Sequence, residues 1–252
     1  MAGENGALEE LGVQVRNIQE TIGFWAVINH GVAWKKLEET YKQLKQFFAL
    51  SDNEKRRYLI NELSIGYVPP KSTKYITSII NENTKKDLNE TLITALERPP
   101  DHPLIKAGTR FVGPNQWPEG LPGFRDAIVS YQQEILKLGR KLLPIFSVAL
   151  ELPPSYFDQY FTDPVMWSRN AHYPAEVPEK NQYGIAPHSD HSFLTMLPTT
   201  EVPGLQILSQ NGNWIDAKYI DKGILVNTGE FLNRWTNGRF IPTPHRVMPP
   251  EK

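Results

Sequence analysis

Residues 184–197 read Gly-Ile-Ala-Pro-His-Ser-Asp-His-Ser-Phe-Leu-Thr-Met-Leu, and they carry the strongest clue to the architecture of this chain. Their apolar positions indicate a strand, in which side chains two residues apart project from the same face. His188 and Asp190 have this spacing. An imidazole nitrogen and a carboxylate oxygen can therefore reach a single metal ion from this one segment.

A second histidine, His245, would complete a set of two histidines and one carboxylate. Such a set covers one face of an octahedral ion and leaves three positions open, the arrangement of non-haem Fe(II) oxygenases. The sequence contains no cysteine, which excludes disulfides, thiolate sites and iron–sulfur clusters within it and leaves iron, manganese or zinc as metals. A His-x-Asp triplet also recurs by chance, so alone it would be better explained as part of a polar surface loop.

The sequence after about residue 165 has the pattern of short strands separated by Gly and Pro turns. Residues 205–208 and 214–217 flank Gln-Asn-Gly-Asn at 210–213, which predicts a hairpin. Further strands are predicted at 224–227, 231–235 and 239–241, the last two joined by an Asn-Gly turn. Short strands of this kind favour a sandwich or a jelly roll.

Before residue 165 the spacing of apolar residues is mainly helical. Four helices are predicted: 8–22, 34–50, one capped by Ser-Asp-Asn-Glu at 51–54, and 123–152, which Pro153-Pro154 would stop. Residues 24–28 predict a buried strand, and residues 71–111 show no clear pattern. We therefore predict one α+β unit, in which a mostly helical N-terminal part (1–165) packs on a β-core (166–252).

The segment 184–197 resembles the iron-binding strand of the isopenicillin N synthase-like branch of the Fe(II)/2-oxoglutarate oxygenase superfamily. The resemblance continues in the same order through Val-Pro-Gly-Leu-Gln-Ile (202–207), Gly-Asn-Trp-Ile (212–215), Val-Asn-Thr-Gly-Glu-Phe-Leu (226–232), Thr-Asn-Gly (236–238) and Thr-Pro-His-Arg-Val (243–247). Residues 24–32 resemble the early strand of this family. The spacing of 54 residues (191–244) between Asp190 and His245 is also typical of it.

This resemblance implies a double-stranded β-helix (jelly-roll) core with His188, Asp190 and His245 as Fe(II) ligands. It further implies 2-oxoglutarate and O2 as co-substrates, with ascorbate as a helpful additive. Succinate and CO2 would be released while a small organic molecule is hydroxylated, desaturated or cyclised, as in specialised metabolism. Tyr173, in His-Tyr-Pro at 172–174, matches a tyrosine that often contacts the co-substrate carboxylate; an ordinary half-buried strand residue is the alternative.

One departure from the family pattern leaves alternatives open. Users of 2-oxoglutarate in this family have an Arg-x-Ser motif beyond the second histidine, and arginine suits the far carboxylate because it binds both oxygens. This chain ends at Lys252, so we expect it to be part of a longer protein. An oxidase of the isopenicillin N synthase type and a non-catalytic metal- or ligand-binding relative are the alternatives. Arg169 and Arg246 could replace the anchor, although Arg246 should face away from the metal because it neighbours His245.

Other polar residues near the motif receive structural interpretations. Strand alternation predicts that His191 faces away from the metal. We expect His30 to be a turn residue and His102 to be exposed to solvent, and Glu230 is a candidate for orienting the strand of His245. Substrate specificity is expected from the helical N-terminal part, from residues 63–80 and from a C-terminal portion beyond Lys252.

The charge balance points to no polyanionic partner. There are 27 basic and 28 acidic residues, and the net charge of −1 gives no electrostatic reason to expect nucleic acid or an anionic membrane. No apolar run approaches the length of a membrane span, and the first residues lack a signal-peptide pattern. We expect a cytoplasmic protein that acts on a small molecule; its oligomeric state stays open.

Overall fold

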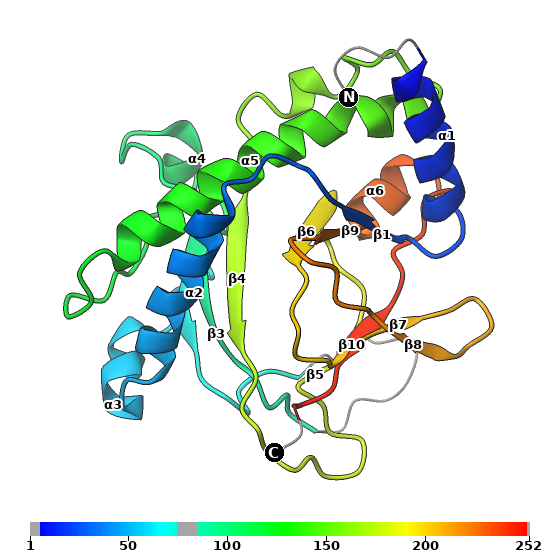
Figure 1. Ribbon diagram of the computed structural model, residues 1–252. Coiled ribbons are helices and arrows are strands. Elements are labelled where there is room, and N and C mark those ends of the chain that lie inside the picture. Colours follow the sequence, from blue (N-terminus) through cyan, green and yellow to red (C-terminus); the bar gives the residue numbers. More distant parts are fainter. Residues whose placement is uncertain (1–5, 75–84, 251–252) are drawn as a thin grey trace.

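A long helix, α5 (Phe124–Ala149), crosses the top of the computed structural model, which describes residues 6–74 and 85–250 (Figure 1). It packs against α1 (Ala7–Gln19) and α2 (Trp34–Phe48). All three were predicted from the sequence, but α5 ends at Ala149, before the two prolines. Its end is fixed from outside, because Arg16 Nε donates a hydrogen bond of 2.7 Å to the carbonyl of Ala149, and Glu151 adopts a left-handed conformation (φ 62°).

Two antiparallel sheets form the β-core. The first has the strand order β1 (Phe24–Val27), β9 (Ile224–Thr228), β6 (Leu194–Pro198). The second has the order β5 (Ile185–His188), β10 (His245–Val247), β7 (Leu205–Leu208), β8 (Trp214–Asp216). The predicted hairpin is confirmed as the β7–β8 pair, with Gly212 in the turn at φ +78°. Strand β1 also shows that the N-terminal part supplies an edge of the core.

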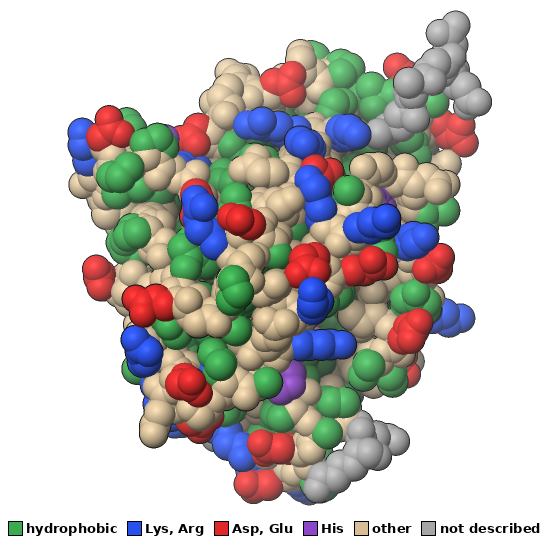
Figure 2. Space-filling model, turned by 60° about the vertical axis from the view of Figure 1, so that its left-hand side comes forward, with side chains coloured by type: hydrophobic (Ala, Val, Ile, Leu, Met, Phe, Trp, Pro, Cys, Tyr) green, Lys and Arg blue, Asp and Glu red, His purple; other side chains and the backbone are tan. Residues whose placement is uncertain are grey.

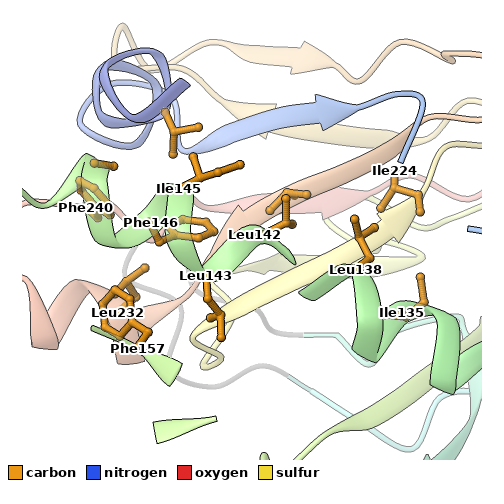
Figure 3. Packing of buried hydrophobic residues seen from close by; sticks show 13 residues of the cluster. Ile135, Leu138, Leu142, Leu143, Ile145, Phe146, Phe157, Ile224, Leu232 and Phe240 are labelled. Carbon is orange, nitrogen blue, oxygen red and sulfur yellow. The ribbon is translucent and has the colours of Figure 1, made fainter. Parts of the chain in front are cut away.

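The first sheet is joined to α1 and α5 by a continuous apolar cluster (Figure 3). Leu142 and Phe146 of α5 pack with Ile224 and Val226 of β9, and Val15 of α1 belongs to the same cluster. Each of these side chains is at most 3% exposed. Full burial of one such side chain contributes about 1.5–3 kcal/mol, so this cluster fixes the helical layer on the sheet.

A third antiparallel sheet was not predicted. It has the order β2 (Gly66–Val68), β3 (Glu90–Ala95), β4 (Trp167–His172), so it joins the two sides of the boundary near residue 165. Every residue of β3 is buried, including Glu90, Thr91 and Thr94. A strand buried on both faces with polar residues in it lacks the alternation by which strands are recognised in sequence.

Two strand predictions near the C-terminal end are wrong. Residues predicted as a strand at 231–235 form helix α6 (Glu230–Trp235), and no strand is described at 239–241. The Asn-Gly pair at 237–238 ends this helix instead of turning a hairpin, because both residues have positive φ and Gly238 N–H bonds to the carbonyl of Asn233 at 2.8 Å.

Four short helices complete the described elements. These are α3 (Asp52–Lys55), α4 (Pro103–Lys106) and the 3-10 turns η1 (Arg56–Tyr58) and η2 (Asp158–Tyr160). The capping box predicted at 51–54 is confirmed, with Ser51 and Glu54 bonded reciprocally. No helix among the described residues is both long enough and apolar enough to cross a membrane.

A buried ionic network holds β2, β3 and β4 to α3. Glu90 Oε2 accepts hydrogen bonds from Lys55 Nζ at 2.8 Å and from the Tyr67 hydroxyl at 2.5 Å. Glu90 Oε1 lies 2.9 Å from His172 Nδ1. Lys55 and Glu90 are each only 5% exposed, so they form a buried ion pair, and Lys55 also lies 3.5 Å from the exposed Asp52.

Candidate metal centre

His188, Asp190 and His245 converge where β5 and β10 meet. Antiparallel pairing places His245 directly opposite His188, and the two ring centroids are 4.4 Å apart. Asp190 follows the end of β5 and approaches both rings. One ligand atom from each of the three residues lies within 4.8 Å of the others. The sequence-predicted ligand set is thus brought together, with Asp190 in a loop and not in the strand that we expected.

The main chain orients both imidazole rings. His188 Nδ1 lies 2.9 Å from the carbonyl of Ala186, and His245 Nδ1 lies 3.2 Å from the carbonyl of Thr243. A carbonyl oxygen only accepts, so in the neutral form of either ring Nδ1 carries the proton and Nε2 carries the lone pair. The Nε2 atoms lie 3.8 and 3.7 Å from Asp190 Oδ1. Three donor atoms thus face one another in the form in which they bind a metal.

Asp190 is held by the core sheet. Its Oδ2 accepts a hydrogen bond of 2.8 Å from the side-chain amide of Asn227 on β9, and Thr195 on β6 bonds to the same carboxylate. Gly229 allows the loop that contains Asp190 and Ser192 to lie against the main chain just after β9. A Cβ at Gly229 would lie 2.6 Å from the carbonyl oxygen of Asp190 and 2.5 Å from that of Ser192, so only glycine fits without moving the loop.

The electrostatics favour a neutral imidazole beside an ionised carboxylate. Burial, reinforced by the neighbouring His245, lowers the pKa of His188 well below its usual value. Burial alone would raise the pKa of Asp190, but His245 and the hydrogen bonds from Asn227 and Thr195 outweigh it and lower the pKa. Around neutral pH, His188 therefore offers an imidazole lone pair and Asp190 a negative charge, which suits a divalent cation.

The other residues singled out in the sequence have the following places. Tyr173 lies half-buried just past β4 and close to Gly184, where a Cβ would come within 2.8 Å of the tyrosine ring. His191 turns outward as predicted, and its Nδ1 lies 2.9 Å from Glu230 Oε2. The Glu230 side chain therefore bonds to His191 at the surface, and the suggestion that it orients the strand of His245 is wrong.

Two further histidines have structural contacts. The ring of His30 bonds to the carbonyl of Lys222 and to the main chain of its own turn, as predicted for a turn residue. His102 is not simply exposed: its Nδ1 caps α4 and its Nε2 lies 3.2 Å from Asp163. Of the segment 63–80, residues 75–80 lie outside the described residues.

The two candidate anchors differ in position. Arg246 faces away from the metal centre, with Nε bonded to Gln206 at 2.7 Å and its guanidinium 4.1 Å from the ring of Trp214. Arg169, on β4, donates to Asn89 Oδ1 at 3.3 Å, and its charge acts on His188. Sequence reasoning left Asn227 out of the site, although a buried amide in the middle of the apolar strand Ile-Leu-Val-Asn-Thr was an available signal.

Comparison with known proteins identifies the family. Residues 164–252 match the model of the 2OG-Fe(II) oxygenase superfamily, and residues 2–120 match the N-terminal model described as non-haem dioxygenase in morphine synthesis. A curated relative from Citrus sinensis, Kihadalactone A synthase LFS, is 33% identical over 237 residues, which cover 90% of this chain and 69% of the relative. The chain belongs to the 2OG-Fe(II) oxygenase superfamily.

Two further similarities agree with this assignment. Azadirone synthase LFS from Melia azedarach is 33% identical over 97% of this chain and 75% of its own length. A full-length Neurospora crassa protein, crystallised in complex with alpha-KG, superimposes with a TM-score of 0.81 at 25% identity, over 100% of this chain and 77% of that one. As a member of the 2OG-Fe(II) oxygenase superfamily, the chain is an oxidoreductase with a jelly-roll core.

Removal of the amide that holds Asp190 should weaken metal binding. In Asn227→Ala, Asp190 Oδ2 loses its 2.8 Å hydrogen bond, and the carboxylate gains rotational freedom. Loss of such a supporting contact typically lowers metal affinity about 10- to 100-fold. Anaerobic Fe(II) titration would measure the change, with Asn211→Ala in the exposed β7–β8 turn as the control. Equal affinities in the two variants would contradict a role for Asn227.

Proposed function

We propose that this chain binds one Fe(II) ion through His188, Asp190 and His245 and couples the decarboxylation of 2-oxoglutarate to the oxidation of a small organic molecule. The observation that carries the proposal is the approach of two imidazole Nε2 atoms to Asp190 Oδ1, at 3.8 and 3.7 Å. Bound iron would supply the redox chemistry with 2-oxoglutarate and O2, from three positions that these ligands leave open.

The contribution of the chain is preparation of the site. Main-chain carbonyls set the tautomers of His188 and His245, and Asn227 holds the carboxylate of Asp190. No proton has to leave His188 Nε2 when a cation binds near neutral pH, because this imidazole is already neutral. His245 also packs edge-to-face against Phe24, with ring centroids 5.3 Å apart, and is 9% exposed, so water is largely excluded from that side.

Tyr173 is proposed as a contact for the co-substrate carboxylate. Its support is its position, half-buried beside Gly184 at the entry to the strand of His188. The hydroxyl of a tyrosine can donate a hydrogen bond to a carboxylate.

For the substrate, we propose only a class, a small organic molecule of specialised metabolism. The names of the relatives include two plant synthases and the 2-oxoglutarate-dependent dioxygenases tropC and citB, which supports specialised metabolism as the setting. Hydroxylation, desaturation and ring closure are all compatible with the site. We keep a cytoplasmic location, a small-molecule substrate and a helpful effect of ascorbate as parts of the proposal. The face in Figure 2 mixes acidic and basic side chains without a continuous basic area, in line with a partner that is not nucleic acid.

An anaerobic titration tests the proposal directly. Fe(II) is added to the chain, then 2-oxoglutarate, and the visible spectrum is followed for the metal-to-ligand charge-transfer band. We expect one equivalent of iron to bind and the band to develop as 2-oxoglutarate chelates it. Iron binding without the band would instead favour an oxidase that does not use 2-oxoglutarate. Absence of iron binding would contradict the assignment of the three ligands.

A further inference from the structure

The two faces of β4 have different surroundings. Ser168 and His172 point toward the helical layer, where Gln132 of α5 bonds to Ser168 Oγ at 3.1 Å and Phe48 of α2 stacks on His172. Because side chains alternate along a strand, Trp167 and Arg169 point to the opposite face. That face is the one turned toward β5, because Arg169 reaches Asn89, whose own amide bonds to the carbonyl of Gly184 at 2.6 Å.

Arg169 is a half-buried cation without an ion pair among the residues that the structure describes. Its hydrogen bond to Asn89 engages a neutral amide. The nearby carboxyl of Asp87 is 1% exposed and accepts the main-chain N–H of Ala186 at 2.8 Å, but it forms no ion pair with the guanidinium. Burial raises the pKa of Asp87 to about 6, against the opposing effects of Ala186 and Arg169. A partly desolvated arginine in such a place is suited to an anion brought by a ligand.

The arginine lies close to the strand that carries His188. Its hydrogen-bond partner Asn89 bonds to the carbonyl of Gly184, and the neighbouring Asp87 accepts the main-chain N–H of Ala186, so both bond at the start of β5 (Ile185–His188). A ligand carboxylate on the guanidinium would therefore place the rest of the same small molecule along β5, toward the proposed iron.

Trp167 adds an aromatic surface next to the arginine. It lies two residues away on the same face of β4, about 7 Å along the strand, and 38% of it is exposed. Its ring stacks on Phe111 with centroids 4.3 Å apart and planes at 10°, and Arg110 lies over the Phe111 ring at 4.6 Å. This stack holds the indole in a fixed orientation and provides a flat apolar wall.

We infer that the inner face of β4 is a binding subsite for a small aromatic or planar carboxylic acid, with Arg169 on the carboxylate and Trp167 against the ring. The inference rests on the proposed function, since the proposed iron beside this face defines where the ligand reacts. The planar fork of arginine binds both oxygens of a carboxylate, which distinguishes an acid from its neutral amide. The carboxylate bound by Arg169 has two candidate sources. One is the organic substrate that undergoes oxidation, and the other is the far end of 2-oxoglutarate.

Calorimetric binding of two matched probes tests the subsite without turnover. The probes are 3-phenylpropanoate and its neutral analogue 3-phenylpropanamide, titrated into the wild-type chain, Arg169→Gln, Arg169→Lys and Trp167→Leu. In parallel, 2-oxoglutarate is titrated into the same proteins loaded with Fe(II) under anaerobic conditions. Arg246→Gln is the control, because Arg246 lies on β10 and faces Gln206 and Trp214.

We expect the wild-type chain to bind the acid about tenfold or more tightly than the amide, as for a charged hydrogen-bond pair. Arg169→Gln should remove this preference, Arg169→Lys should restore part of it, and Trp167→Leu should weaken both probes alike. The Arg246→Gln control should behave as wild type. Unchanged 2-oxoglutarate affinity in Arg169→Gln would assign the carboxylate to the substrate.

The other outcomes are equally distinct. If Arg169→Gln instead lowers 2-oxoglutarate affinity tenfold and leaves the probes unaffected, Arg169 anchors the co-substrate and the substrate assignment is wrong. If the chain binds the acid no more tightly than the amide, and if 2-oxoglutarate binding does not depend on Arg169, the proposed subsite is wrong. Failure of the proposed function would look different: no charge-transfer band in the wild type, while acid binding still depends on Arg169.

Discussion

Fe(II) binding is expected to be lost in His188→Ala and in Asp190→Ala, with affinity reduced on the order of a hundredfold or more. Each change removes one of three donor atoms that lie within 4.8 Å of one another. Loss of a contact that only supports a metal ligand typically lowers metal affinity about 10- to 100-fold, so loss of a ligand itself should lower the affinity by more than that. In His188→Ala, the remaining His245 and Asp190 would offer only two donors.

The matched control for this experiment is His191→Ala. His191 is adjacent to Asp190 in sequence, but its side chain is exposed and pairs with Glu230. Anaerobic Fe(II) titration and the charge-transfer band with 2-oxoglutarate would be measured for all three variants. Wild-type iron affinity in either ligand variant, or a loss of iron in His191→Ala as large as theirs, would contradict the proposed ligand set.

A second large effect is expected on stability, far from the metal. Glu90→Gln should lower the free energy of unfolding by about 3 kcal/mol, because it removes the buried carboxylate of Lys55 and leaves this buried charge only the exposed Asp52, at 3.5 Å. Three hydrogen bonds converge on Glu90 from Lys55, Tyr67 and His172, so the change also weakens the joint between the third sheet and α3. Urea unfolding would measure the difference.

A surface pair provides the comparison. Glu39 and Lys42 form an exposed ion pair on α2, and Glu39→Gln should change stability little because water already solvates both groups. Similar losses in the two variants would show that burial of the Lys55–Glu90 pair is not what makes it important.

The same carboxylate predicts how stability depends on pH. Burial opposes ionisation of Glu90, but hydrogen bonds from His172, Lys55 and Tyr67 outweigh it and lower the pKa to about 2, from an ordinary value of 4.5. Because the folded pKa is lower than the unfolded one, the stabilisation is complete above about pH 5 and is lost as the pH falls toward 2. The wild type should therefore lose more stability than Glu90→Gln over this interval.

Local patterns in the sequence were sufficient for much of this protein. Helical spacing predicted α1, α2 and α5, and Ser51 with Glu54 predicted a capping box that the structure contains. The turn at 210–213 predicted the β7–β8 hairpin. The order of motifs from His188 to His245 was enough to place the chain in its superfamily, because these signals lie within short segments or recur at a fixed spacing.

Other features depended on partners distant in sequence. The Asn-Gly pair at 237–238 ends a helix instead of forming the turn of a hairpin. The reason is that the chain around it packs Leu232 and Phe240 into the core under α5. Strand β3 is hidden from pattern analysis because both its faces are covered and its polar residues find buried partners. Strand alternation next to His245 was enough to predict that Arg246 faces away from the metal, where it stacks on Trp214. Nothing local placed Arg169 on the face of β4 turned toward β5, because that position depends on the pairing of β4 with β3.

The sequence by itself therefore determined the family, the main helices and the identity of the three metal-binding candidates. The tertiary structure decided which side chains surround them: Asn227 on Asp190, main-chain carbonyls on the two histidines, and Arg169 on the face turned toward β5. The physical reason is that residue type and spacing encode local conformation, whereas hydrogen bonds, burial and charge in a site come from strands that meet only when the chain is folded.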